Sequence, residues 1–175
     1  MNIFTGTESN ELFGGPVPAA VLRMLDEARQ QPRDQAAATL WSAALGSPHS
    51  LPAYYLLYKL HTGLGELDSA RQAALMGLNA AARAAALKAH WTQVSPDDAD
   101  FNQPGPARFW LFTLKALAFI ELRRGQPEAV RPLLAQLQRL DPEDRLGSSL
   151  IGRMLEASEA PTVSGLRPPT SPNTP

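Results

Sequence analysis

The chain has 175 residues, which is enough for one compact domain with its own hydrophobic core. Its 16 basic and 17 acidic residues give a formal net charge of −1, so the whole molecule has no electrostatic field that would gather nucleic acid or anionic lipid. The absence of cysteine excludes disulfides, thiol catalysis and cysteine-ligated zinc or iron–sulfur sites.

Nothing in the sequence indicates a membrane or export signal. Residues 1–18 contain neither a basic start nor an apolar run of signal-peptide length. The most apolar stretch, 109–120, is shorter than the roughly 20 residues of a membrane span and is interrupted by Thr113 and Lys115. We therefore expect a cytoplasmic protein that does not act at a membrane.

The composition and spacing of apolar residues predict an all-α fold. Alanine and leucine are abundant, β-branched residues are sparse, and apolar positions recur every three or four residues. The first helix is expected to open near Pro16 or Pro18, because a first-turn proline loses no hydrogen bond. Its apolar stripe is Val21, Leu25 and Ala28.

A second helix is expected from about Asp34 to Leu45. Gly46 and Pro48 follow it and supply the stop signals. Its apolar face consists of Ala37, Leu40, Trp41 and Ala44.

A third helix is expected after Ser50, whose hydroxyl is of the type that caps helix N-termini. Pro52 falls in its first turn, and the helix is expected to end at Gly63 or Gly65.

Asp68 is expected to cap a fourth helix that runs unbroken to about Gln93. The break follows at Ser95–Pro96, because a residue before proline disfavours the helical conformation. Residues 95–106 (SPDDADFNQPGP) are acidic and rich in proline and glycine, which predicts a long loop.

Three more helices are predicted after this loop. The fifth is expected at 107–124 and ends at Gly125, and Pro127 opens the sixth. Asp141–Pro142–Glu143 combines a capping acid with a first-turn proline, which predicts the start of a seventh helix. Its apolar side carries Leu146, Leu150, Ile151, Met154 and Leu155.

The two ends of the chain are predicted to lie outside the folded domain. Residues 158–175 contain five prolines and no apolar periodicity, so they bury too little surface to offset the entropy of ordering. We expect a flexible segment at 1–15, a helical domain at 16–157 and a disordered tail at 158–175.

The sequence contains an internal repeat. A shift of 34 residues places Gln31 on Gly65 and Ala36 on Ala70 without a gap. Residues 65–70, GELDSA, provide a glycine for a helix C-terminus, then turn residues with an acid, then a small residue where two helices touch.

These features resemble the tetratricopeptide repeat (TPR) family. Pro48 and Pro142 match the proline that ends each repeat of the family, and Ala118, Gly125 and Ala129 match a third unit. The resemblance implies antiparallel helix pairs stacked into a short right-handed α-solenoid. The units implied are 16–50, 51–94 and 107–142, with a capping helix at 142–157 and the loop 95–106 as an insertion.

The family resemblance also implies a concave groove, lined by the first helix of each pair, that binds a partner polypeptide. The matching positions here are Tyr55, Lys59 and Thr62 in the second unit, and Phe112, Lys115, Phe119 and Arg123 in the third. Aromatic rings alternating with lysines suit an amphipathic or acidic peptide. Phe112 and Phe119 also fit a second interpretation, a helix buried centrally in the core. Some members of the family bind free C-termini through a carboxylate clamp of paired lysine and asparagine positions. This clamp is disfavoured here, because Phe119 and not an asparagine stands one turn after Lys115.

No catalytic, metal or cofactor motif is present. His49, His61 and His90 are not paired at helical spacing. Asp97, Asp98 and Asp100 in the loop lack the spacing of a calcium-binding loop and are expected to be solvated. We therefore expect no enzymatic activity, no metal and no cofactor.

The sequence thus predicts a protein–protein interaction module, either an adaptor or a chaperone-like accessory protein. A first alternative is a self-assembling scaffold in which helix 107–124 forms the seam of a homodimer. A remote alternative is an enzyme with a dispersed site. Nucleic-acid binding is not expected, because no basic stripe surrounds the tryptophans.

Overall fold

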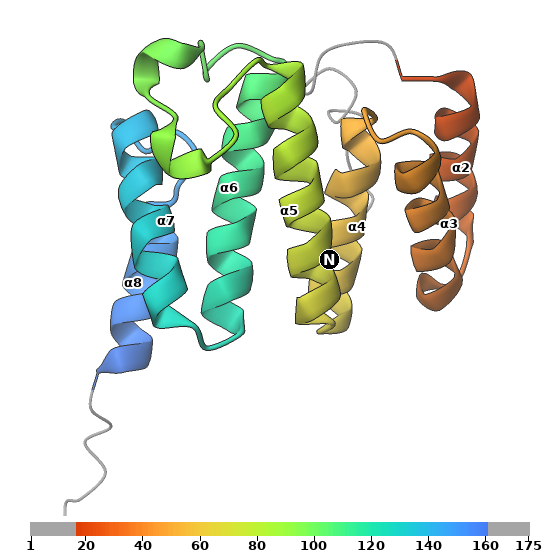
Figure 1. The fold of residues 1–175 in the computed structure, drawn as a ribbon. Helices are drawn as coiled ribbons and strands as arrows, with labels where there is room; N and C mark the ends of the chain where they lie inside the picture. The colour runs from red at the N-terminus through yellow and green to blue at the C-terminus, as the bar shows by residue number, and fades with distance from the viewer. Residues whose placement is uncertain (1–16, 161–175) are drawn as a thin grey trace, which may run out of the picture.

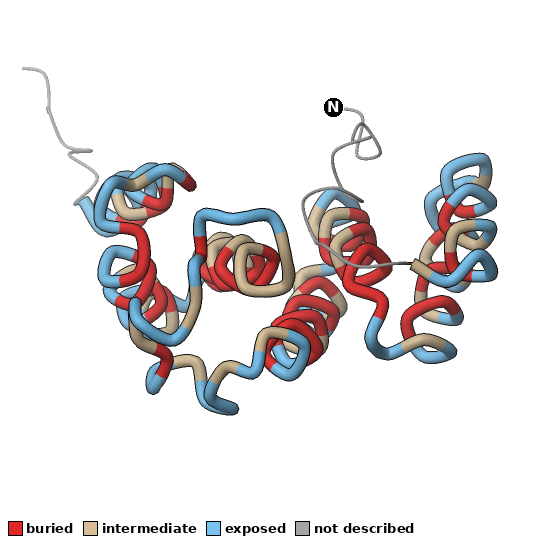
Figure 2. The backbone as a smooth tube through the Cα atoms, turned by 90° about the horizontal axis from the view of Figure 1, so that it is seen from above, coloured by how far each residue is buried: buried red, intermediate tan, exposed pale blue. Residues whose placement is uncertain are grey.

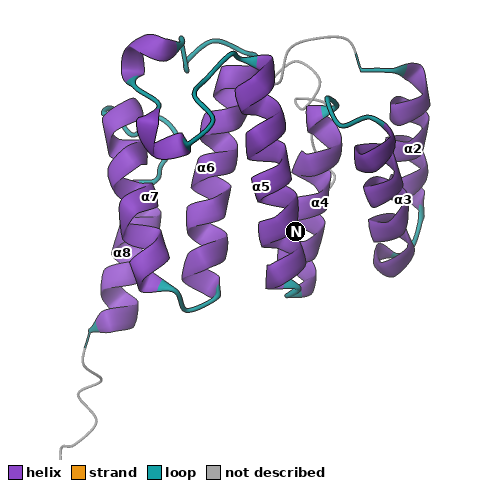
Figure 3. Cartoon of the chain, in the orientation of Figure 1, coloured by secondary structure: helices purple, strands orange, loops and turns teal. Residues whose placement is uncertain are grey.

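A computed structural model describes residues 17–160 (Figure 1). The expected flexible segment 1–15 and residues 161–175 of the expected tail lie outside the described residues. Within 17–160 all regular structure is helical and no strand is present (Figure 3), which confirms the all-α class. The α-helices are α2 (Ala19–Gln30), α3 (Arg33–Gly46), α4 (Leu51–Leu64), α5 (Leu67–Ala84), α6 (Pro106–Arg123), α7 (Pro127–Leu140) and α8 (Ser149–Glu159), and the 3₁₀ helices are η1 (Trp91–Gln93) and η2 (Pro96–Asp98).

The α-helices stand side by side, and each packs against the next one in the chain (Figure 1). Further contacts join alternate helices, α4 with α6 and α6 with α8. The segment 85–105, which carries η1 and η2, lies over α6 and α7 at the top of Figure 1.

The core is centred on α6, which packs against α4, α5, α7 and α8. Phe109, Trp110 and Leu114 of this helix are at most 1% exposed. Seen from above, buried residues lie along the inner sides of the helices (Figure 2). Burial of large apolar side chains between helices is the main stabilising term of such a fold.

The first two helices follow the predicted pattern. Val21, Leu25 and Ala28 are the buried residues of α2. In α3, Leu40 and Ala44 are buried, whereas Ala37 and Trp41 are only half-buried and Ala36 and Ala43 take part in the core instead.

Two of the predicted glycine helix ends, Gly65 and Gly125, are confirmed, whereas Gly46 is the last residue of α3 and Ser47 is its C-cap. Gly65 ends α4 with a φ of +79°, and Gly125 follows α6 with a φ of +68°. In both turns the next residue donates its N–H to a carbonyl five residues back: Glu66 to His61, and Gln126 to Glu121. This is the hydrogen-bond pattern of a Schellman motif, in which glycine is favoured because it has no Cβ.

The predicted N-caps are only partly correct. Ser50 stands at the N-cap of α4, but its side chain makes no capping hydrogen bond. Asp68 lies in the first turn of α5, because this helix starts at Leu67 with Glu66 as N-cap.

The predicted continuation of the fourth helix to Gln93 is wrong, because α5 ends at Ala84. Ala86 adopts a φ of +53°, and the Leu87 N–H donates to the Ala82 carbonyl, so this end is also a Schellman motif. The chain turns back because Val94, which is fully buried, binds α7: Gln136 Nε2 donates to the Val94 carbonyl at 2.7 Å.

The predicted start of the last helix is also wrong. Residues 141–148 form turns, and α8 begins at Ser149. The Asp141 carboxylate organises these turns, since it accepts the N–H groups of Arg145 at 3.1 Å and Leu146 at 2.9 Å. An acid followed by proline therefore stabilises a loop here and does not open a helix.

α8 differs from the prediction in two further ways. It extends through Glu159, two residues beyond the expected end of the domain. Ile151 and Leu155 are buried as expected, but Leu150 and Met154 are exposed. In the part of the chain that the structure describes, no helix has the length and apolar character needed to cross a membrane.

Candidate functional site

The candidate residues of α4 lie on one half-buried face of that helix. Tyr55, Lys59 and Thr62 are spaced by four and three residues, which places them on one side. Lys59 Nζ donates to the Tyr55 hydroxyl at 3.1 Å and lies 4.7 Å from the centre of its ring. The rings of Tyr55 and Tyr58 also pack in a T-shaped arrangement, with their centres 5.6 Å apart. These contacts hold the lysine against the aromatic ring, so the pair presents an apolar surface with a cationic tip.

Arg123 joins the candidate residues of α6 to this face. Phe112 and Phe119 are half-buried against the core, and the Arg108 guanidinium lies 5.3 Å from the centre of the Phe112 ring. Arg123 is exposed, and its NH1 donates to the Thr62 carbonyl at 2.9 Å. This bond joins the C-terminal ends of α4 and α6. We call the surface formed by Tyr55, Lys59, Thr62, Phe112, Phe119 and Arg123 the α4–α6 face.

Lys115, the remaining candidate, has a structural contact that the sequence did not indicate. Its Nζ donates to the carbonyl of Leu146 in the turn before α8. The lysine is half-buried and lies beside Gly147. It therefore fastens the 141–148 turn to α6, and we do not include it in the α4–α6 face.

The charge on this face is one-sided. α4 and α6 carry the cations Lys59, Arg108, Lys115 and Arg123. The acidic residue on these two helices, Glu121, is 4% exposed. Its carboxylate lies 2.5 Å from Arg71 Nε and 2.7 Å from Arg124 NH1. Since that carboxylate is already paired, the α4–α6 face is net basic.

Glu121 belongs to an ion-pair network between α5 and α6. Arg124 also binds Asp68, at 2.8 Å. The hydrogen bond from Arg124 to Glu121, followed by that to Asp68, raises the pKa of the Arg124 guanidinium above its ordinary value. The network holds the two helices together, and it explains a buried acid that the sequence pattern had not marked as structural.

His61 is part of a second buried contact, between α3, α4 and the turn after α4. Trp41 Nε1 donates to His61 Nε2 at 2.9 Å, and His61 Nδ1 lies 2.6 Å from a carboxylate oxygen of Glu66. The histidine side chain is 5% exposed, whereas that of Glu66 is 53% exposed. An imidazole already occupied on both nitrogens has a structural role and offers no ligand to a metal.

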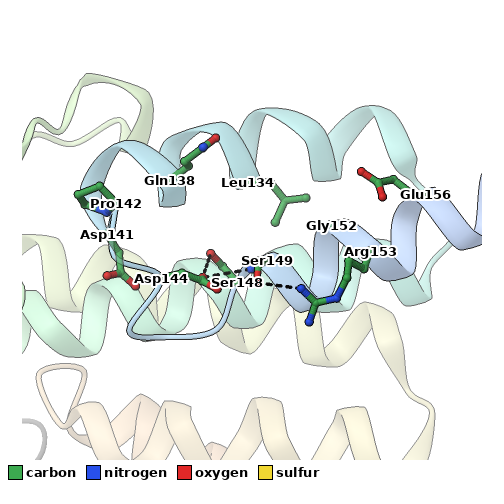
Figure 4. A pocket seen from close by; sticks show the side chains of 10 residues that line it. All are labelled: Leu134, Gln138, Asp141, Pro142, Asp144, Ser148, Ser149, Gly152, Arg153 and Glu156. Atoms are coloured by element: carbon green, nitrogen blue, oxygen red, sulfur yellow. Dashed lines mark hydrogen bonds between the residues drawn. The ribbon is translucent and has the colours of Figure 1, made fainter.

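A pocket of about 430 Å³ lies between α7, α8 and the 141–148 turns (Figure 4). Leu134 of α7 and Gly152 of α8 face each other across it. Asp144 lines the pocket as well and accepts hydrogen bonds from the Ser148 hydroxyl and the Ser149 N–H. Hydrogen bonding from Ser149 is the main cause that lowers the pKa of the Asp144 carboxyl. Ser148 and Ser149 therefore both hydrogen-bond to Asp144 at the wall of the pocket.

The acidic loop and His90 make local contacts with their neighbours in the chain. The N–H of Ser95 and then Lys88 lower the pKa of the exposed Asp98 carboxyl. His90 lies on Trp91 and hydrogen-bonds Thr92. Within residues 17–160, no cluster of three or more histidines and acids is placed to hold a metal ion.

In comparisons with family models, with curated proteins and with solved structures, nothing matches the chain.

Proposed function

We propose that the chain is a non-enzymatic protein–protein interaction module with a TPR-like right-handed arrangement of helix pairs. In this proposal α2 and α3, α4 and α5, and α6 and α7 are the pairs, and α8 is the cap. Contacts of α4 with α6 and of α6 with α8 support it, because a solenoid stacks the first helix of each pair on the next one. The glycine turns at Gly65 and Gly125 recur at equivalent places, between the two helices of a pair.

The α4–α6 face is the proposed binding surface, and its occupant is a helix or extended segment of another protein. One observation carries this proposal: the face combines half-buried aromatic rings with cations. The acidic residue on α4 and α6, Glu121, is already paired with arginines and does not neutralise those cations. Tyrosine and phenylalanine bury large areas at low entropic cost. Lys59 and Arg123 at the rim add attraction for acidic partner residues and favour fast association.

The self-assembling alternative, a dimer seam on helix 107–124, has less support. The largest apolar side chains of α6 face the other helices of the same chain and are at most 1% exposed in Phe109, Trp110 and Leu114. Only the half-buried side of α6 remains to contact another molecule. That side belongs to the α4–α6 face, where Lys59 and Arg123 of two copies would repel each other.

Affinity capture from the native lysate tests the proposal. The wild-type chain is compared with a Tyr55→Ala/Lys59→Glu variant, which leaves the Lys115 contact intact. Arg83→Glu is the matched control, because Arg83 is an exposed cation on α5 and is not part of the α4–α6 face. Circular dichroism confirms that all three chains fold.

We expect a protein that the wild type and the Arg83→Glu chain retain and that the Tyr55→Ala/Lys59→Glu chain loses. Equal capture by all three chains would remove the α4–α6 face from the proposal. Loss in the Arg83→Glu chain alone would move the binding surface to α5.

A further inference from the structure

Two segments of the chain lie outside residues 17–160, and they differ in charge. Residues 1–16 (MNIFTGTESNELFGGP) carry two acids, Glu8 and Glu11, and no lysine, arginine or histidine. Residues 161–175 carry one arginine and no acid. The first segment also contains two phenylalanines, whereas the second has no aromatic residue. Of the two, therefore, only segment 1–16 combines negative charge with aromatic rings.

The α4 part of the α4–α6 face has the complementary character. α4 contains a lysine and no acidic residue. Within residues 17–160 the Lys59 ammonium contacts the hydroxyl and the ring of Tyr55, and no carboxylate pairs with it. Both side chains are half-buried. A segment with an acid and an aromatic ring therefore supplies a counter-ion for the lysine and further apolar contact for the tyrosine.

We propose that segment 1–16 binds the α4–α6 face of its own chain, with Glu11 at Lys59 and Phe13 at Tyr55. The spacing of the two pairs agrees. Side chains two residues apart on an extended segment lie on one side, about 7 Å from each other. Residues four apart on a helix lie on one side as well, about 6 Å apart along the axis. An extended segment that runs along α4 therefore brings both pairs together at once.

Segment 1–16 is long enough to reach this part of α4. It joins the helical domain at Val17, directly before α2, and α2 and α4 both begin at the top of Figure 1. Because α3 packs against both helices, α2 and α4 are at most two helix spacings apart, or roughly 20 Å. Glu11 precedes Val17 by six residues, which span about 20 Å when extended. The long side chains of Glu11 and Lys59 cover the remaining distance along α4.

The inference rests on the proposed function, because the segment takes the surface assigned to a partner. A segment tethered in this way acts at an effective concentration on the order of 1 mM. A partner then binds only the fraction of chains in which the face is open, so its apparent affinity falls by that fraction. Segment 1–16 is therefore an internal competitor of the partner.

A nitroxide label on the full chain tests the contact without any partner. Because the chain has no cysteine, Asn10→Cys provides a single thiol for the label. We expect paramagnetic broadening of the backbone amide signals of Tyr55 and Lys59 in the NMR spectrum. Ser164→Cys places the label in segment 161–175 and is expected to leave these two signals sharp. Broadening from Ser164→Cys and not from Asn10→Cys would overturn the proposal in favour of the other segment.

Charge reversal tests the proposed pairing of Glu11 with Lys59. In the labelled chain, Glu11→Lys and Lys59→Glu are each expected to abolish the broadening, and the double variant is expected to restore it, because opposite charges meet again. Arg83→Glu makes the same charge change on α5, outside the face, and is expected to have no effect. Circular dichroism confirms that every variant folds.

Three results would overturn the proposal. The first is sharp Tyr55 and Lys59 signals in the Asn10→Cys chain, and the second is broadening that tolerates Glu11→Lys or is not restored in the double variant. The third is broadening that arises only between chains, when an isotope-labelled chain without the thiol is mixed with an unlabelled chain that carries the nitroxide.

Affinity capture separates this inference from the proposed function. The Glu11→Lys chain is expected to retain more of the partner than the wild type, because its face is open. Broadening in the NMR experiment with no partner captured by this chain would support the segment contact and contradict the proposed function. Sharp NMR signals, with capture that depends on Tyr55 and Lys59, would overturn the segment contact and leave the proposed function in place.

Discussion

Ala86 and Asp144 are the non-glycine residues of 17–160 that adopt a positive φ, and alanine has no side-chain polar group to support that conformation. The Ala86 φ of +53° lies in the left-handed region, which costs a residue with a Cβ about 1 kcal/mol relative to glycine. We predict that Ala86→Gly raises the free energy of unfolding by about 1 kcal/mol. Gly65→Ala, at the equivalent place with a φ of +79°, should lower it by a similar amount. Urea unfolding measures both, and a destabilised Ala86→Gly chain would contradict the assignment.

The hydrogen bonds of His61 predict the imidazole tautomer that carries its proton on Nδ1. The indole N–H of Trp41 can only donate, so His61 Nε2 must accept, and Nδ1–H then donates to Glu66. Nitrogen NMR of the imidazole distinguishes the two tautomers. Trp41→Phe removes the donor and is expected to destabilise the chain by about 1 kcal/mol. A proton found on Nε2 near neutral pH would disprove this hydrogen-bond assignment.

At the scale of helices, two glycines have opposite roles. A Cβ on Gly77 of α5 would lie 2.8 Å from Tyr54 Cβ of α4, whereas a Cβ on Gly152 of α8 would lie 3.9 Å from Leu134. Alanine in a helix is favoured over glycine by up to about 1 kcal/mol. At Gly77 the clash outweighs this gain, because overpacking costs about 1–3 kcal/mol and Tyr54 Cβ cannot move without its backbone.

We therefore predict opposite signs for the same substitution. Gly77→Ala should lower the free energy of unfolding by about 1–2 kcal/mol, and Gly152→Ala should raise it by about 0.5–1 kcal/mol. Thermal and urea unfolding of the two variants check this. Stabilisation by Gly77→Ala would mean that α4 and α5 are farther apart than the structure shows.

Local signals predicted the helices well where a helix end depends on its own residues. Gly65 and Gly125 are such cases, since glycine alone favours the left-handed cap. α5 ends at Ala84 for a different reason: Val94, ten residues later, is buried and bound by Gln136. The alanine-rich sequence of α5 does not indicate the contact between Val94 and Gln136. The prediction for Asp141 was wrong because its carboxylate can cap either a helix or a turn. Here Leu146 is buried and its N–H donates to the Asp141 carboxylate, so the carboxylate caps a turn.

For the whole molecule, the sequence predicted a shared surface for the candidate residues but could not assign their contacts. Tyr55 and Lys59 share a face because helical spacing requires it. The bond from Arg123 to Thr62 and the bond from Lys115 to Leu146 join residues 61 and 31 positions apart. Such contacts depend on the packing of α4, α6 and α8, and spacing along the chain does not reveal them.

The most direct test of the central claim is photo-crosslinking in the native cells. A photoreactive phenylalanine replaces Tyr55 in one chain and Arg83 in another, so the probes lie on the α4–α6 face and on α5 respectively. We predict a discrete adduct with another protein from position 55, and none from position 83. Adducts from position 83 alone, or from neither position while the chain is folded and abundant, would contradict a binding module that uses this face.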